Sequence, residues 1–149
     1  MRNFKLEELT LDLIEEAFPL FLGHFKEISA NQDIPLEPDY EQYLKLSEMG
    51  FLRFFSSRDA AGKLIGYAVF FVKTNLHYKS SKQAVQDIIY INPKSRGFGS
   101  EFIAWCDEML RAEGCQIVYH HVKAAHNWGK VLDRMGYKMV EFIYSKRLD

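Results

Sequence analysis

The first third of the chain has a hydrophobic pattern that predicts one short strand followed by helix. Residues 4–6 form a short run typical of a strand, and Thr10 is a favourable N-cap residue for a helix. Apolar residues then recur at the three- and four-residue spacing of a helix as far as Ile28. Because Pro19 and Gly23 interrupt this stretch, we expect either a kinked helix or two short helices.

A second helix and three strands are expected in the middle of the chain. Residues 31–38 have the composition of a loop, and the helix predicted over 39–49 stops at Gly50, a residue that favours helix C-termini. Runs rich in aromatic and β-branched residues follow, and residues 59–62 between them are typical of a turn. These runs predict strands at 51–55, 64–74 and 84–91.

The last third of the chain alternates helices and strands. A loop after the third strand leads into a helix predicted over 100–113. A strand, a helix and a final strand are then expected at 116–122, 126–135 and 137–148. The strand–helix–strand unit should form a parallel, right-handed crossover, whereas the hairpins before it are antiparallel. The predicted fold class is therefore α+β with a mixed sheet.

The composition excludes several classes of protein. The 149 residues fit one domain, 1–149, and the 19 basic against 20 acidic residues argue against broad nucleic-acid binding. No run approaches the roughly 20 apolar residues of a membrane span, and the acidic residues soon after Met1 do not fit a signal peptide. Cys106 and Cys115 provide neither a disulfide framework nor a metal site. We therefore expect a cytoplasmic protein that binds no metal.

Residues 88–100 carry the strongest chemical signal in the chain. A strand ends there, a basic loop containing Gly97 and Gly99 follows, and a helix begins. Glycines let a ligand approach the backbone, and free amides at a helix start attract anions, while Lys94 and Arg96 add positive charge. The loop fits a pyrophosphate, although the same glycines could serve only a tight turn. It lacks the GxxxxGK[ST] and GxGxxG patterns of common nucleotide-binding loops.

Residues 94–99, Lys-Ser-Arg-Gly-Phe-Gly, resemble the Q/R-x-x-G-x-G/A motif of the GNAT superfamily, the acyl-CoA-dependent N-acetyltransferases. Lys at the first position is a mild departure from that motif. The predicted order of elements also resembles the GNAT order over nearly the whole chain. The resemblance implies a mostly antiparallel central sheet with helices on both faces. It further implies a V-shaped gap for acetyl-CoA, the cosubstrate, where the parallel strands 84–91 and 116–122 splay apart.

The resemblance also implies which groups hold and activate acetyl-CoA. Five backbone amides would bind the pyrophosphate, those of Arg96, Gly97, Phe98, Gly99 and Ser100, with Lys94 beside them. The backbone of Ile89 and Ile91 would pair with the pantetheine arm like an added strand, and the Ile89 amide would polarise the thioester carbonyl. Asn127 would contact the pantetheine.

The reaction needs a base, because an alkyl amine is mostly protonated near neutral pH. Asp87 is the first candidate, because strand alternation places it on the face of Ile89 and Ile91, where related enzymes often keep an acidic base. His121 is the second candidate and is preferred to His120, which falls at a position usually apolar in the family. An exposed or salt-bridged carboxylate stays open as an alternative for Asp87, and simple packing or exposure for the histidines.

Four residues are candidates for contacts with the amine acceptor. His24 and Glu27 lie on the first helix, where GNAT proteins line the acceptor pocket, and His77 and Tyr78 lie in the loop between two central strands. The tyrosine that many members use as the general acid in the last helix is replaced here by Leu132.

The leading hypothesis is a cytoplasmic N-acetyltransferase that transfers an acetyl group from acetyl-CoA to a small-molecule or protein amine. Leu132 motivates an alternative, an acyl-CoA-binding module that acts as a sensor or scaffold without turnover. A phosphate- or nucleotide-binding protein of unrelated fold is a third hypothesis, which rests on the loop alone. Many relatives form homodimers, so a homodimer is compatible with the resemblance, whereas a nucleic-acid partner does not fit the balanced charge.

Overall fold

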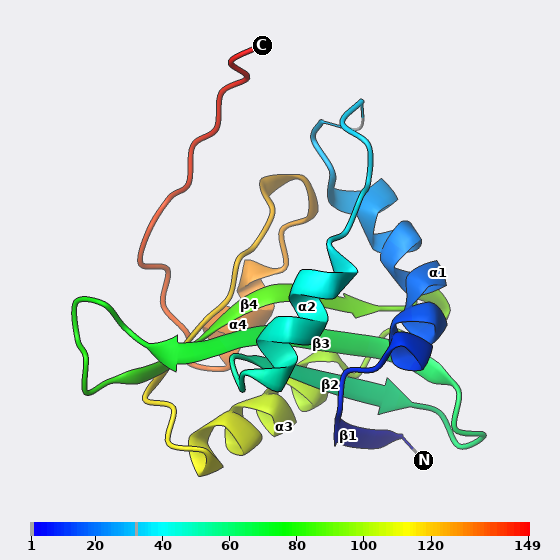
Figure 1. The fold of residues 1–149 in the computed structure, drawn as a ribbon, viewed down its shortest axis with the longest axis horizontal. Helices are drawn as coiled ribbons and strands as arrows, with labels where there is room; N and C mark the ends of the chain where they lie inside the picture. Colours follow the sequence, from blue (N-terminus) through cyan, green and yellow to red (C-terminus); the bar gives the residue numbers. More distant parts are fainter. Residues whose placement is uncertain (1, 32) are drawn as a thin grey trace.

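A computed structural model describes residues 2–31 and 33–149, and a mixed sheet lies at its centre (Figure 1). Within the described residues the strand order is β1-β2-β3-β4-β5. Neighbours are antiparallel as far as β4, and β4 and β5 are parallel. The strand bounds are β1 Asn3–Glu7, β2 Leu52–Arg58, β3 Leu64–Thr74, β4 Lys82–Ile91 and β5 Ile117–Tyr119. This arrangement confirms the predicted α+β class and its mostly antiparallel sheet.

Helices cover both faces of this sheet, as expected. Their bounds are α1 Leu11–Ile28, α2 Tyr40–Glu48, α3 Gly99–Ala112 and α4 Gly129–Arg134, with 3-10 turns η1 Pro93–Ser95 and η2 Ala124–His126. One core cluster joins α1 and α2 to the sheet around Leu13 and Tyr67. The other joins α3 to the opposite face around Phe70 and Phe102. No helix in the described part of the chain is long and apolar enough to cross a membrane.

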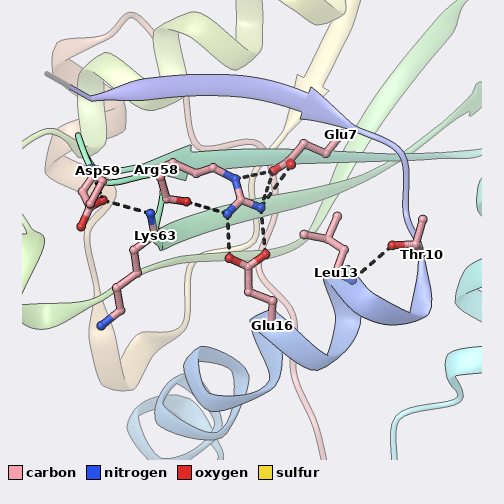
Figure 2. A network of polar contacts seen from close by, with 9 residues as sticks. Glu7, Thr10, Leu13, Glu16, Arg58, Asp59 and Lys63 are labelled. Carbon is pink, nitrogen blue, oxygen red and sulfur yellow. Dashed lines mark hydrogen bonds and ion pairs between the residues drawn. The ribbon is translucent and has the colours of Figure 1, made fainter.

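Arg58 fastens the first helix to the edge of the sheet (Figure 2). Its guanidinium donates hydrogen bonds of 2.7–3.1 Å to the carboxylates of Glu7 on β1 and Glu16 on α1. In the same view the hydroxyl of Thr10 accepts a bond from the Leu13 amide, which caps the start of α1 as predicted. The Arg58 side chain is only 12% exposed, whereas that of Glu16 is 40% exposed, so the network is partly covered and holds three elements together.

Helix α1 is continuous through Pro19, so the expectation of two short helices is wrong. Proline removes one backbone hydrogen bond, but Leu13 and Phe21 on either side of it pack into the same cluster and hold both halves on the sheet. Gly23 lies where the helix passes closest to Tyr90 of β4. A Cβ atom on Gly23 would lie 2.9 Å from the Tyr90 hydroxyl oxygen, so a larger residue here would require the Tyr90 side chain to shift.

The final strand expected over 137–148 does not form, and that prediction is wrong. The chain after α4 is assigned to no helix or strand and runs away from the sheet to the C-terminus (Figure 1). Its large apolar side chains are exposed, namely those of Met139, Val140, Phe142, Ile143, Tyr144 and Leu148. A strand needs a neighbour for its hydrogen bonds, and β5, expected over 116–122, has only three residues to offer.

Candidate active site at the open edge of strand β4

Strands β4 and β5 pair at one end and separate at the other. Their register joins three residue pairs, the last being Val85 with Tyr119, and β5 then ends while β4 continues to Ile91. From Gln86 onward β4 is therefore paired on its β3 side only. The splayed parallel strands predicted from the sequence are present, and they leave one edge of β4 open to a ligand.

The backbone of Ile89 and Ile91 points toward this open edge. The Asn92 amide donates a 2.8 Å hydrogen bond to the Ile65 carbonyl on the β3 side. Because successive residues of a strand point their polar groups in alternate directions, Tyr90 also faces β3, whereas Ile89 and Ile91 face away from it. The Ile91 carbonyl accepts a bond from the Arg96 side chain, so the N–H and C=O of Ile89 are the pair left for an added strand.

A β-bulge at Asp87 changes the direction of the side chains along β4. Ile88 lies opposite Val69 and Gln86 lies opposite Phe70, which leaves Asp87 as the extra residue. Asp87 therefore points to the α2 side of the sheet, the same side as Ile88. Ile89 and Ile91 pack with the α3 cluster on the other face. The expectation that Asp87 shares a face with these two isoleucines is wrong, because the bulge interrupts the alternation.

The carboxylate of Asp87 is held by a tyrosine that the sequence did not suggest. The hydroxyl of Tyr43 on α2 donates a 2.5 Å hydrogen bond to Asp87 Oδ2. Burial, together with the bond to Asp87 and its charge, raises the pKa of Tyr43 far above its ordinary value of 10, so this hydroxyl stays protonated. Only the apolar spacing of the 39–49 helix marked Tyr43, and that spacing indicates packing. The other oxygen, Oδ1, has no partner among the described residues.

The loop after β4 presents unpaired amides at the start of α3. The side chain of Asn92 accepts from the Lys94 amide and its carbonyl accepts from Ser95, which fixes the first turn of the loop. The five amides from Arg96 to Ser100 have no acceptor among the described residues, and α3 begins without a side-chain cap. Gly97 has a φ of 118°, which few other residues adopt. Free amides at a helix start suit an anion such as a diphosphate.

The charge on the Arg96 side chain is already neutralised. Its guanidinium forms a bidentate pair with Glu27 of α1, with both oxygens at 2.9 Å, and lies over the Tyr90 ring. Glu27 therefore ties α1 to the loop, which differs from the acceptor contact expected for it. Lys94 is exposed and has no ion-pair partner within the described residues, so its ammonium is the cation left for a phosphate.

His24 belongs to the same junction. Its ring lies 5.1 Å from that of Tyr90, and burial lowers its pKa to about 4, although the nearby Glu27 carboxylate opposes this shift. A neutral, half-buried histidine between α1 and β4 contributes to packing there. His77 and Tyr78 are exposed in the β3–β4 turn, at the end of β4 opposite to the loop. The structure does not bring these two near Asp87.

His120, rather than the preferred His121, takes part in a side-chain network at the end of β5. Its Nδ1 lies 2.7 Å from the Gln86 side-chain oxygen, and its Nε2 lies 3.2 Å from the Tyr137 hydroxyl, which donates to Asp107. Burial lowers the pKa of His120 to about 4. His121 is exposed and forms no hydrogen bond or ion pair with the described residues.

The last helix carries the two remaining candidates. Leu132 is buried, in keeping with a packing role. The side-chain oxygen of Asn127 accepts a 2.9 Å bond from the Gly129 amide at the start of α4, so this residue organises the helix start. Its side-chain nitrogen is left for a ligand.

No family model matches the chain, and no curated protein matches it in sequence. Solved structures resemble it in fold. A ribosomal-protein-alanine N-acetyltransferase from Brucella melitensis biovar Abortus has a TM-score of 0.74 at 16% identity, covering 100% of both chains. An aminoglycoside acetyltransferase from an uncultured soil metagenomic sample has a TM-score of 0.71 at 16% identity, covering 98% of this chain and 97% of the other.

Glucosamine-6-phosphate N-acetyltransferase from Arabidopsis thaliana is a third neighbour, with a TM-score of 0.69 at 15% identity and 99% of each chain covered. The three proteins act on different amines, so their likeness concerns the scaffold. Together with the splayed strands and the amide-lined loop, they identify the architecture: this chain has the fold of the GNAT N-acetyltransferases.

Proposed function

We propose that the protein is an acetyl-CoA-dependent N-acetyltransferase, which transfers an acetyl group directly from the thioester to an amine. The observation that carries the proposal is the row of five unbonded amides from Arg96 to Ser100, next to the open edge of β4. A diphosphate needs such donors, and an extended pantetheine arm needs such an edge. Both lie on one continuous stretch of chain.

The backbone of β4 would position the thioester. Acetyl-CoA supplies an activated acetyl group when it is bound. The C=O of Ile89 would accept a hydrogen bond from a pantetheine amide in the way one strand bonds to another. The Ile89 N–H would face the thioester oxygen, where negative charge develops during acyl transfer. Stabilisation of that charge by a fixed backbone donor requires no catalytic side chain.

Asp87 would remove the proton from the attacking amine, directly or through one water molecule. Tyr43 occupies Oδ2 and fixes the plane of the carboxylate, so Oδ1 is the oxygen left to accept that proton. The bulge gives Asp87 this position, because it turns the side chain to the α2 face while Ile89 stays at the open edge. The amine would reach the thioester from the side of α1 and α2.

The departing thiolate has no tyrosine to protonate it, because Leu132 stands at the usual position of the acid. We propose that the thiolate takes its proton from solvent. The same leucine favours a second candidate function, acyl-CoA binding without turnover as a sensor or scaffold. Thiol release with acetyl-CoA and a broad panel of amines separates the two functions. Turnover with any amine supports the enzyme, and tight CoA binding with no turnover across the panel supports the sensor.

A competition experiment tests the ligand class itself. CoA should displace bound acetyl-CoA, whereas ATP at the same concentration should not. Displacement by both would instead support a general phosphate or nucleotide site, with no role for the open strand edge. Isothermal titration calorimetry measures both affinities without requiring catalysis.

A further inference from the structure

An apolar cavity lies between α1, α2 and the sheet, on the face to which Asp87 points. Its volume is about 60 Å³, and none of the described residues that line it is charged. Half of its lining is aromatic, comprising Phe18, Phe21, Tyr40, Tyr43, Phe54 and Tyr67. The polar side-chain atoms among its lining residues are tyrosine hydroxyls. Such a wall binds hydrocarbon or aromatic groups and the faces of its rings can attract a cation.

A wider hollow beside the loop between α1 and α2 borders the cavity. The hollow measures about 480 Å³ and shares Phe21, Pro38 and Tyr43 with the cavity. Two acidic residues, Glu37 and Asp39, line this outer hollow, and none of the other described residues around it is charged. The surface therefore combines an apolar interior with a negatively charged entrance, which is complementary to a hydrophobic cation.

Tyr43 connects the cavity to the site proposed for proton removal, although Asp87 itself does not line the cavity. Tyr43 lines the cavity and donates its hydroxyl proton to Asp87. Ile88, the next residue along β4, lines it as well. An amine that reaches Asp87 Oδ1 past the Tyr43 ring would place its carbon skeleton against this lining, between α1 and α2.

We propose that the acceptor is a small primary amine on a short chain that ends in an aromatic or branched apolar group. The inference rests on the proposed function and adds the substrate class to it. The ring or alkyl group would fill the cavity and part of the hollow, while the ammonium is drawn to Asp87. Polyhydroxylated or phosphorylated amines are disfavoured, because the lining offers too few partners for hydroxyls and no cation for a phosphate.

Binding of the acceptor is measured in a dead-end complex that needs no turnover. The full-length protein is saturated with CoA and titrated by calorimetry with 2-phenylethylamine, ethanolamine or glucosamine 6-phosphate. We expect 2-phenylethylamine to bind at least about tenfold more tightly than the other two, because the cavity removes its phenyl group from water. Rates of acetyl transfer from acetyl-CoA should follow the same order.

A matched pair of variants tests whether the cavity itself makes this selection. Phe18 and Leu22 both lie on α1 and are both 38% exposed, but only Phe18 lines the cavity. Phe18→Ser should reduce the preference for 2-phenylethylamine severalfold, whereas Leu22→Ser should leave it unchanged. Unchanged affinity for CoA shows that each variant is folded.

The outcomes separate this inference from the proposed function. If CoA binds and polar amines are acetylated as well as 2-phenylethylamine, the assignment of an apolar acceptor is overturned and the acetyltransferase stands. The assignment of an apolar acceptor is also overturned if Phe18→Ser and Leu22→Ser change the preference for 2-phenylethylamine equally. If CoA does not bind at all, the proposed function itself fails.

Discussion

The hydroxyl of Tyr43 on α2 donates a 2.5 Å hydrogen bond to the carboxylate of Asp87, the bulged residue of β4. This contact joins a helix and a strand that are 44 residues apart in sequence. It fixes one carboxylate oxygen and leaves the other without a partner in the described structure. An acidic group held in this way, beside an open strand edge, is suited to accept a proton from an amine.

Replacement of Asp87 tests its role as the base. Asp87→Ala and the isosteric Asp87→Asn should each lower kcat by about 100-fold or more, because a general base contributes that much to proton transfer. The affinity for CoA, measured by calorimetry, should stay close to that of the unaltered protein. Tyr43→Phe retains the carboxylate and should cost less than about tenfold in kcat. Wild-type turnover in Asp87→Asn would remove this residue from the mechanism.

Gly97 and Gly114 form a matched pair for testing the loop. Both have positive φ, at 118° and 90°, and they lie before and after the same helix, α3. Alanine at either position should destabilise the protein by about 1–2 kcal/mol, because a side chain disfavours positive φ. Only Gly97→Ala should also weaken CoA binding, since it moves the amides of the loop. Equal CoA affinities in the two variants would contradict a role for these amides.

Gly99 provides a steric test of the same loop. A Cβ atom there would meet only the Ile91 side chain, at 3.6 Å, so Gly99→Ala should fold and bind CoA almost normally. Gly99→Trp would place an indole across the start of α3 and should abolish CoA binding while the melting temperature changes little. CoA affinity retained in Gly99→Trp would show that the ligand does not lie against this turn.

His120 makes the stability of the fold depend on pH. Burial lowers its folded-state pKa from 6.5 to about 4. Between these pH values His120 is protonated in the unfolded chain but neutral in the folded protein. The free energy of unfolding is therefore unaffected by protonation of His120 above pH 6.5. It decreases as the pH falls from 6.5 toward 4, with a slope of up to about 1.4 kcal/mol per pH unit. Urea unfolding at pH 7 and pH 5 should show a smaller loss for His120→Gln than for the unaltered protein. An equal loss of stability in the variant and in the unaltered protein would show that groups other than His120 take up the proton.

The sequence predicts elements well where local signals determine them. Strand β3 has the predicted bounds of 64–74, since a long apolar run lies between two turns, and the Thr10 cap is where its side chain indicated. Glycine spacing predicted the amide-lined loop, because a tight turn before a helix leaves its first N–H groups unpaired.

Features that depend on contacts between distant residues were not predictable in this way. The bulge at Asp87 follows from the register between β3 and β4, and no residue in the alternating pattern marks the extra position. Tyr43 reaches Asp87 only after α2 is docked on the sheet. The tail over 137–148 has the composition of a strand, but composition does not supply the neighbouring strand that it needs.

The most direct test of the account is a titration of the ¹⁵N-labelled protein with CoA, followed by the backbone amide signals. We predict that the largest shifts occur at the five amides from Arg96 to Ser100, with a further shift at Ile89. The amide signals of His77 and Tyr78 in the distant turn should not shift. If CoA saturates the protein while the amides from Arg96 to Ser100 do not move, the diphosphate is bound elsewhere and the proposed active site is wrong.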